Sequence, residues 1–244
     1  MGSAWYESWF DSPYYELLYQ HRDGAEAANF LKALMPHLKL TPQASVWDMA
    51  CGQGRHAILL KHLGLNVLAS DLSKKSIEKA RGMFPELDVE VRDMRNCPKQ
   101  KFEAVFNLFT SIGYFENSQD NQNVFNAAAE ALHAHGLFIL DFFNAQTVSA
   151  AVTEKAEVYM RNGVLFNIKK TIRNNRVIKS IQVTDGALNF DYLESVELFQ
   201  KHDLCHMADK SGFECIHCFG DYALNPFDIQ ASPRLILIFK RLHA

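Results

Sequence analysis

Acidic residues follow three short apolar segments, and a pair of glycines follows the first of these segments. Asp48, Asp71 and Asp93 each stand where an apolar run ends, and Gly52 and Gly54 come soon after Asp48. Glycine tolerates backbone angles and close approaches that a Cβ would block. Apolar residues at helical spacing follow the glycines, and a helix N-terminus offers free N–H groups and a positive dipole end. The pattern predicts a strand, a glycine turn and a helix that together hold a nucleoside-containing cofactor.

The glycine spacing alone does not identify that cofactor. Gly52, Gly54 and Ala57 also satisfy the dinucleotide fingerprint, with alanine in the third place. Asp48 separates the two interpretations, because a carboxylate at the end of the first strand would face the phosphates of a dinucleotide. The same carboxylate suits a cofactor that carries an ammonium and a sulfonium group.

The other two acids fit the remaining parts of such a cofactor. Asp71 follows the glycines by about 20 residues, the spacing at which a carboxylate accepts hydrogen bonds from ribose hydroxyls. Asp93 and Met94 follow the third strand, where a carboxylate would suit the exocyclic amine of adenine and an apolar side chain its ring face. Three acids in this order are more specific than any one of them.

These motifs resemble class I S-adenosylmethionine-dependent methyltransferases of the small-molecule type. The matching segments are VWDMACGQGRHAILLKHLGLNVLASDLS, VRDMRN, FEAVFNLFTSIGYF and GLFILDFFN. The resemblance covers residues 44–144 and continues weakly at 212–214 and 232–239. It departs from the family at Gln53, where Thr or Ser is commoner, and this casts little doubt because the backbone makes the contact there.

The resemblance implies that the chain binds S-adenosyl-L-methionine and releases S-adenosyl-L-homocysteine. Asp48, Gly52 and Gly54 would line the methionine part, Asp71 would hold the ribose, and Asp93 with Met94 would hold the adenine. The full set of candidate cofactor-binding residues is Tyr15, Arg22, Asp48, Ala50, Gly52, Gly54, Asp71, Leu72, Asp93, Met94 and Leu108.

The residues after the fourth strand bear on the methyl acceptor. Methyl transfer from a sulfonium is an in-line displacement, so the protein aligns the nucleophile and excludes water. Residues 107–110 lack the Asn/Asp-Pro-Pro-Tyr/Phe run that would indicate methylation of an exocyclic or amide nitrogen. Aromatic residues near the methyl donor would also suit a cationic amine. The candidates for catalytic positioning are Tyr14, Ser111 and Tyr114, with Tyr15, Phe115, Asn144 and Tyr222 as further acceptor-side residues.

Composition excludes several other classes. The 244 residues carry a formal net charge of −3, with Lys and Arg scattered, so no nucleic-acid partner is expected. No apolar run is long enough for a transmembrane helix, and the N-terminus does not read as a signal peptide. Five cysteines without framework spacing indicate reduced thiols and a cytoplasmic location. We expect no metal site, because period two in a strand would place Cys215 and Cys218 on opposite faces. His56 is expected to pack at the start of its helix.

The order of elements predicts an α/β fold with a Rossmann-like, seven-stranded, mostly parallel sheet. Strands and helices alternate from 44 to 144, and the resemblance implies the strand order 3-2-1-4-5-7-6. Residues 1–40 are predicted as an N-terminal helical lid over the cofactor, although their aromatic residues could instead cover one edge of the sheet. Residues 41–150 and 201–244 form the predicted methyltransferase domain. Residues 151–200 alternate apolar and polar, which indicates an antiparallel β insertion that covers the substrate.

The favoured function is therefore methyl transfer to a nitrogen, oxygen or sulfur nucleophile of a small molecule, by a monomer or homodimer. The alternative is a non-catalytic S-adenosylmethionine-binding sensor or assembly protein on the same fold. A nicotinamide oxidoreductase is opposed by Asp48 and Asp93, and the acidic balance disfavours a nucleic-acid or protein methyltransferase. The acceptor, its reacting atom and any general base stay open at this point.

Overall fold

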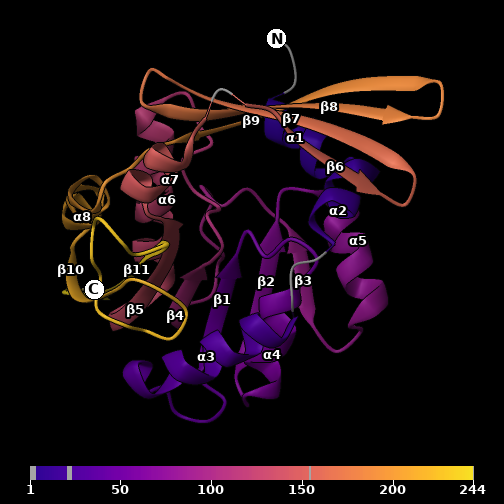
Figure 1. The fold of residues 1–244 in the computed structure, drawn as a ribbon. Helices are drawn as coiled ribbons and strands as arrows, with labels where there is room; N and C mark the ends of the chain where they lie inside the picture. The colour runs from indigo at the N-terminus through magenta and orange to yellow at the C-terminus, as the bar shows by residue number, and fades with distance from the viewer. Residues whose placement is uncertain (1–3, 21–23, 154, 244) are drawn as a thin grey trace. The chain divides into compact units, whose positions relative to one another are not determined.

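The computed structural model describes residues 4–20, 24–153 and 155–243, which form two compact units (Figure 1). The larger unit lies within residues 23–147 and 199–244. The smaller unit combines the N-terminal residues up to 22 with residues 148–198. No helix among the described residues is both long and apolar enough to span a bilayer.

A mixed sheet forms the centre of the larger unit. Its strands are β1 (Ser45–Met49), β2 (Asn66–Asp71), β3 (Asp88–Val91), β4 (Phe102–Asn107), β5 (Leu132–Phe143), β10 (Phe213–Phe219) and β11 (Arg234–Arg241). They lie in the order β10-β11-β5-β4-β1-β2-β3. The pairs among β1 to β5 are parallel, and β11 is antiparallel to both β5 and β10. Within this sheet β10 and β11 are the sixth and seventh strands, so the order is the predicted 3-2-1-4-5-7-6. The predicted fold class is confirmed.

Helices cover both faces of this sheet. They are α3 (Gly24–Leu38), α4 (Arg55–His62), α5 (Lys74–Met83), α6 (Ser118–Ala131) and α8 (Lys201–Lys210). The chain steps outward from β1 to β3 and in the opposite direction from β4 to β5. Because such crossovers are right-handed, α4 and α5 lie on one face and α6 lies on the other.

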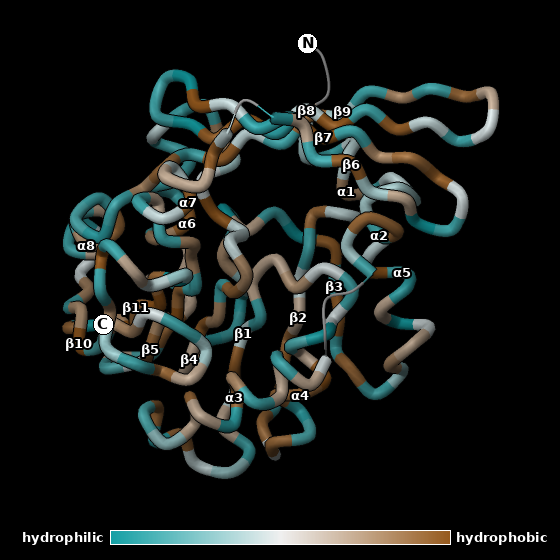
Figure 2. The backbone as a smooth tube through the Cα atoms, in the orientation of Figure 1, coloured by the Kyte–Doolittle hydropathy of each residue, from teal (hydrophilic) through white to brown (hydrophobic). Residues whose placement is uncertain are grey.

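Apolar side chains bury each helical layer against the strands. On one face, Phe30 and Leu34 of α3 join Val46 and Phe106 of the sheet in one core cluster. On the other face, the ring of Phe125 in α6 packs edge-on against the rings of Phe138 in β5 and Phe239 in β11. Hydrophobic residues concentrate along the central strands (Figure 2), as expected for strands buried on both faces.

The smaller unit is an antiparallel meander with two short helices. Its elements are α1 (Trp5–Phe10), α2 (Pro13–Tyr19), β6 (Glu157–Arg161), β7 (Val164–Arg173), β8 (Arg176–Asp185) and β9 (Leu188–Glu197). The strands pair in chain order, and the residues at the turns, such as Asn162 and Asn174, take positive φ as tight hairpins require. One face of the sheet buries Phe166 and Ile181 against Trp9 of α1.

Element boundaries differ from the prediction in three places. Helix α6 ends at Ala131 and strand β5 begins at the next residue, Leu132, a boundary that the sequence pattern did not predict. Helix α7 (Ala145–Ala151) was not predicted. The predicted lid, residues 1–40, is divided between the units, because α3 packs in the core of the larger one. The functions of lid and substrate cover stay predictions.

Candidate functional site

The carboxyl ends of β1 and β4 form the topological switch point of the sheet. These two strands are neighbours, and the chain leaves them toward opposite faces. In open α/β sheets, ligands bind outside the carboxyl ends of the strands at such a point. Residues 48–54 follow β1 into the glycine loop and residues 107–111 follow β4, so both segments belong to the candidate site.

Asp48 places a buried carboxylate at this point with one oxygen unpaired. Its side chain is 1% exposed, and its Oδ2 atom has no hydrogen-bond partner. Burial, and then the nearby charge of Asp71, raise the pKa of Asp48 to about 7, against an opposing hydrogen bond from the Ala57 N–H and the charge of Arg55. Buried polar atoms in proteins are nearly always paired. The unpaired oxygen therefore fits a cationic group of a ligand, such as the ammonium of S-adenosylmethionine.

The glycine loop after Asp48 has the backbone that its residues predicted. Ala50, Gly52 and Gly54 have φ values of 60°, 56° and 82°, in the left-handed region. A Cβ at Gly52 would have nothing within 4 Å, so open space lies beside the backbone there. The Gly52 N–H donates to Asp71 Oδ2 at 2.8 Å, and the Ser73 N–H donates to Oδ1 at 2.8 Å. Asp71 therefore ties the loop to the end of β2.

Both carboxylate oxygens of Asp93 already accept hydrogen bonds within the chain, which the sequence did not suggest. Arg95 donates to both of its oxygens, through Nε at 3.0 Å and a terminal nitrogen at 2.6 Å. Burial would raise the pKa of Asp93, but the hydrogen bonds from Arg95 hold it below its ordinary value. Met94 is buried, whereas Leu72 is 42% exposed. The adenine contacts assigned to Asp93, Met94 and Leu72 stay predictions.

The segment after β4 turns two predicted hydroxyls toward the backbone. The Ser111 hydroxyl donates to the Leu108 carbonyl at 2.9 Å, and the Tyr114 hydroxyl donates to the Thr110 carbonyl. Leu108 itself is buried, as is Asn107, whose Oδ1 atom has no partner. The sequence pattern did not select Asn107 as a site residue, although its amide lies at the end of β4. The positioning roles of Ser111 and Tyr114 stay predictions.

The N-terminal candidates belong to the smaller unit. The Tyr14 hydroxyl donates to Asp185 Oδ2 at 3.0 Å. Tyr15 packs edge-on against Trp9 and Phe10. Arg22 lies outside the described residues. Their predicted contacts with the cofactor or acceptor stay predictions.

A buried ion pair that the sequence analysis missed lies beside the segment after β4. Asp141 of β5 is 1% exposed, and Arg234 of β11 donates to its Oδ1 atom through Nε at 2.8 Å. The Phe109 N–H and the Tyr222 hydroxyl donate to Oδ2, at 2.9 Å and 3.1 Å. Phe109 and Thr110 have φ values of 65° and 60°, a conformation that costs about 1–3 kcal/mol for each non-glycine residue. The sequence did contain a signal for this pair. Asp141 interrupts one apolar strand, and Arg234 begins another.

Three other residues singled out from the sequence are buried or half-buried within the fold. Asn144 is buried and donates to two backbone carbonyls of residues 229 and 232. Phe115 is buried beneath the Arg95 guanidinium. Burial lowers the pKa of His56 to about 3, so its imidazole is neutral near physiological pH.

The expected separation of Cys215 and Cys218 rested on an unbroken strand, and β10 is not one. Its register with β11 shifts between Cys215 and His217. Such a bulge breaks the alternation of faces. A hydrogen bond between Cys215 and Cys205 of α8, then burial, and then the charges of Cys205 and Cys218 raise the pKa of Cys215. No group suited to holding a metal ion is found among the described residues.

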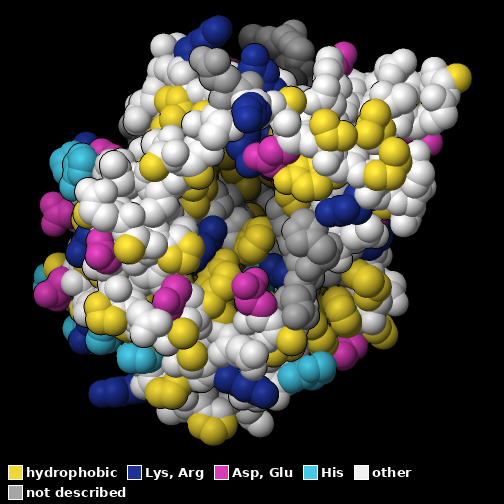
Figure 3. Space-filling view, viewed as in Figure 1, with side chains coloured by type: hydrophobic (Ala, Val, Ile, Leu, Met, Phe, Trp, Pro, Cys, Tyr) yellow, Lys and Arg dark blue, Asp and Glu magenta, His cyan; other side chains and the backbone are white. Residues whose placement is uncertain are grey.

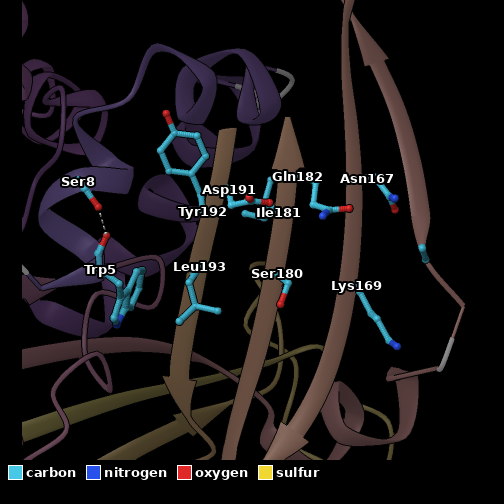
Figure 4. Close-up of a pocket in the computed structure, with 11 residues that line it drawn as sticks. Trp5, Ser8, Asn167, Lys169, Ser180, Ile181, Gln182, Asp191, Tyr192 and Leu193 are labelled. Carbon is cyan, nitrogen blue, oxygen red and sulfur yellow. Dashed lines mark hydrogen bonds between the residues drawn. The ribbon is translucent and has the colours of Figure 1, made fainter. Parts of the chain in front are cut away.

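The smaller unit carries a separate pocket of about 620 Å³ (Figure 4). Asn167, Gln182 and Asp191 line it from three neighbouring strands, where they stand in register. Its described lining includes none of the predicted cofactor-binding residues. Apolar side chains also reach the surface over this sheet (Figure 3), where Val158 and Met160 are 63% and 59% exposed.

Comparison with known proteins supports the interpretation of the larger unit. Residues 46–136 match a family model described as a methyltransferase domain. The chain is 28% identical over 200 residues to dTDP-3-amino-3,4,6-trideoxy-alpha-D-glucopyranose N,N-dimethyltransferase of Streptomyces venezuelae, covering 77% of this chain and 83% of that protein.

Solved structures show the same fold. An S-adenosylmethionine-dependent methyltransferase from Clostridium acetobutylicum ATCC 824 superposes with a TM-score of 0.81 at 19% identity, covering 93% of this chain and 96% of that one. The S-adenosylmethionine-bound amino pentose methyltransferase CalS10 from Micromonospora echinaspora superposes with a TM-score of 0.68 at 19% identity, covering 94% and 97%. With the family match and the Streptomyces relative, the methyltransferase class and the S-adenosylmethionine cofactor predicted from the sequence are confirmed.

Proposed function

We propose that this S-adenosylmethionine-dependent methyltransferase, which acts on small molecules, transfers its methyl group to the nitrogen of an amino sugar. The relative from Streptomyces venezuelae carries this proposal, because its name gives an amino sugar as substrate and nitrogen as the methylated atom. That relationship extends over most of both chains, including the segment after β4 that the acceptor would approach.

The residues at the switch point fit the cofactor, with its methionine part near the end of β1 and its ribose near the end of β2. The unpaired Asp48 oxygen would take the ammonium, the glycine loop would pass beside the methionine part, and Asp71 would take the ribose. When bound, S-adenosylmethionine supplies an electrophilic methyl group and a neutral leaving group. The acceptor nitrogen would then approach from the side of residues 108–111.

The chain's own task in the transfer is to bind and orient an unprotonated amine. An amine lone pair needs no strong base once its proton is lost to solvent, so the reaction requires alignment and exclusion of water more than proton abstraction. In the larger unit, the hydroxyls of Ser111 and Tyr114 are the candidates for orienting the amine by hydrogen bonds. The low pKa of His56 makes this imidazole a weak proton acceptor.

The experiment compares matched acceptors that differ in one atom. The purified chain is incubated with S-adenosylmethionine and a panel of amino sugars, free and as nucleoside-diphosphate esters, each paired with its hydroxyl analogue. We expect the mass of one or two added methylene units on amino compounds and none on their hydroxyl partners. Asp48→Asn should abolish the product, whereas Glu103→Gln, at the opposite end of the sheet, should retain it. Methylation of the hydroxyl analogues in place of the amines would refute the proposal.

The cytoplasmic location and the monomeric or homodimeric state remain part of this proposal. All five cysteines are free thiols, which accords with a reducing compartment. Size-exclusion chromatography with light scattering would decide the oligomeric state directly.

A further inference from the structure

We propose that Asp141 and Arg234 are positioning residues, which clamp the turn at Phe109 and Thr110 and thereby fix the acceptor side of the site. Asp141 and Arg234 lie on adjacent antiparallel strands, β5 and β11, and Phe109 and Thr110 follow β4. The clamp itself consists only of hydrogen bonds within this chain. Its effect on turnover rests on the proposed function.

Asp141 holds the turn with its backbone and its side chain together. The Thr110 N–H donates to the Asp141 carbonyl at 2.9 Å, and the Phe109 N–H donates to the Asp141 carboxylate at 2.9 Å. Arg234 closes the arrangement, because it binds Asp141 Oδ1 and also donates to the Thr110 hydroxyl at 3.1 Å. Two consecutive residues of the turn are therefore bonded to one acid and its arginine.

The conformation of the turn explains why it needs such support. Phe109 and Thr110 both take positive φ, which aromatic and β-branched residues rarely adopt. Backbone strain of this kind persists only where surrounding bonds over-determine it, and it occurs most often at functional sites. Without the acid, the Phe109 N–H would lose its acceptor, and the turn would relax toward negative φ.

The hydrogen bonds of Asp141 distinguish positioning from catalysis. A carboxylate has about four acceptor positions. Asp141 already accepts from the Phe109 N–H, the Tyr222 hydroxyl and two nitrogens of Arg234. An acid so engaged is poorly placed to take a proton from an acceptor, but well placed to hold a backbone.

One aromatic ring lies between the clamp and the start of α4. The Arg234 guanidinium lies over the Phe109 ring at 5.7 Å, and the guanidinium of Arg55, at the start of α4, lies over the same ring at 5.2 Å. Phe109 thus stands between the clamp and the helix that follows the glycine loop. A displaced turn would move the acceptor edge while leaving Asp48 and Asp71 in place.

The test uses two conservative substitutions and a matched control. Asp141→Asn keeps the shape but weakens the acceptor, and Arg234→Lys keeps the charge but loses the forked geometry. Arg241→Lys is the control, because Arg241 stands at the other end of the same strand. Each variant is examined by hydrogen exchange of residues 107–112, by calorimetric titration with S-adenosylhomocysteine, and by kcat and KM for an amine from the panel.

We expect faster amide exchange at residues 107–112 in both variants of the clamp, and a fall in kcat of about tenfold or more with nearly unchanged affinity for S-adenosylhomocysteine. Arg241→Lys should match the wild type in all three measurements. If Asp141→Asn does not fold, as fast amide exchange throughout its whole chain would reveal, Arg234→Lys alone decides the outcome.

Each other result has one meaning. Unchanged exchange at residues 107–112 would refute the clamp whatever the acceptor is. Parallel losses of kcat and S-adenosylhomocysteine affinity would show that the pair supports the whole site, which refutes the acceptor-side role. Faster exchange in a protein whose wild type methylates no amine would establish the clamp and reject the proposed function.

Discussion

Cofactor affinity should depend on the protonation of Asp48. Because burial raises the pKa of this carboxyl, the affinity should fall as pH is lowered. The carboxyl has a pKa of about 7 because burial and the charge of Asp71 oppose its ionisation. It is therefore mostly neutral at about pH 5 and mostly ionised at about pH 8. A cofactor ammonium that needs the carboxylate should bind about tenfold more weakly for each pH unit below 7, which is about 1.4 kcal/mol per unit. At about pH 5 the loss approaches a hundredfold.

The same carboxyl should make the cofactor-free fold less stable as pH rises. Its pKa is higher in the folded chain than the ordinary value of 3.8, so the folded state binds more protons between the two values. The free energy of unfolding therefore falls as pH rises from about 4 to about 7, by at most about 4 kcal/mol. Asp48→Asn removes this cost. The variant should be more stable than the wild type at about pH 8 while it loses tight cofactor binding.

The assay combines calorimetric titration with S-adenosylhomocysteine and urea unfolding of the cofactor-free protein, both at intervals from about pH 5 to about pH 8. Glu103→Gln is the control, because Glu103 accepts from the Ser45 N–H at 2.7 Å at the opposite end of the sheet. That variant should keep the pH profile of cofactor affinity. A flat affinity profile in the wild type, or an Asp48→Asn variant that binds normally, would refute the reasoning.

Three further substitutions test how the fold supports the site. Gly54→Ala should lower the free energy of unfolding by about 1–3 kcal/mol, because φ is 82° and a Cβ would lie 3.2 Å from a leucine methyl; urea unfolding measures this, and an unchanged midpoint would contradict it. Trp47→Phe should cost about 1–3 kcal/mol, since it leaves the buried Ser70 hydroxyl without its 2.8 Å donor; a Trp47→Phe, Ser70→Ala double variant should recover part of the loss. Glu194→Gln should lower the thermal midpoint, because it leaves the Lys179 ammonium, now 3.0 Å from the carboxylate, without that counter-charge. The difference should shrink at low pH, where the wild-type carboxyl, whose pKa Lys179 lowers against burial, also becomes neutral.

Much of the larger unit was predictable because its information is local. The strand that ends at Asp48, the glycine turn and the acid at Asp71 lie within one short stretch, and the side-chain pattern of each segment reports whether it is strand or helix. Right-handed crossovers then leave few ways to order parallel strands. The turns of the meander were equally readable, since Asn and Gly at hairpin positions specify positive φ.

The sequence by itself determined most of the elements that form, which strand ends carry acids, and that those acids suit a sulfonium nucleoside. Only the tertiary structure decided how each acid is used. Asp48 keeps an unpaired oxygen, Asp93 is engaged by Arg95, and Asp141 is consumed in holding the turn at Phe109. The physical reason is that burial and hydrogen-bond partners set a carboxylate's pKa and availability, and those partners come from strands far apart in the chain.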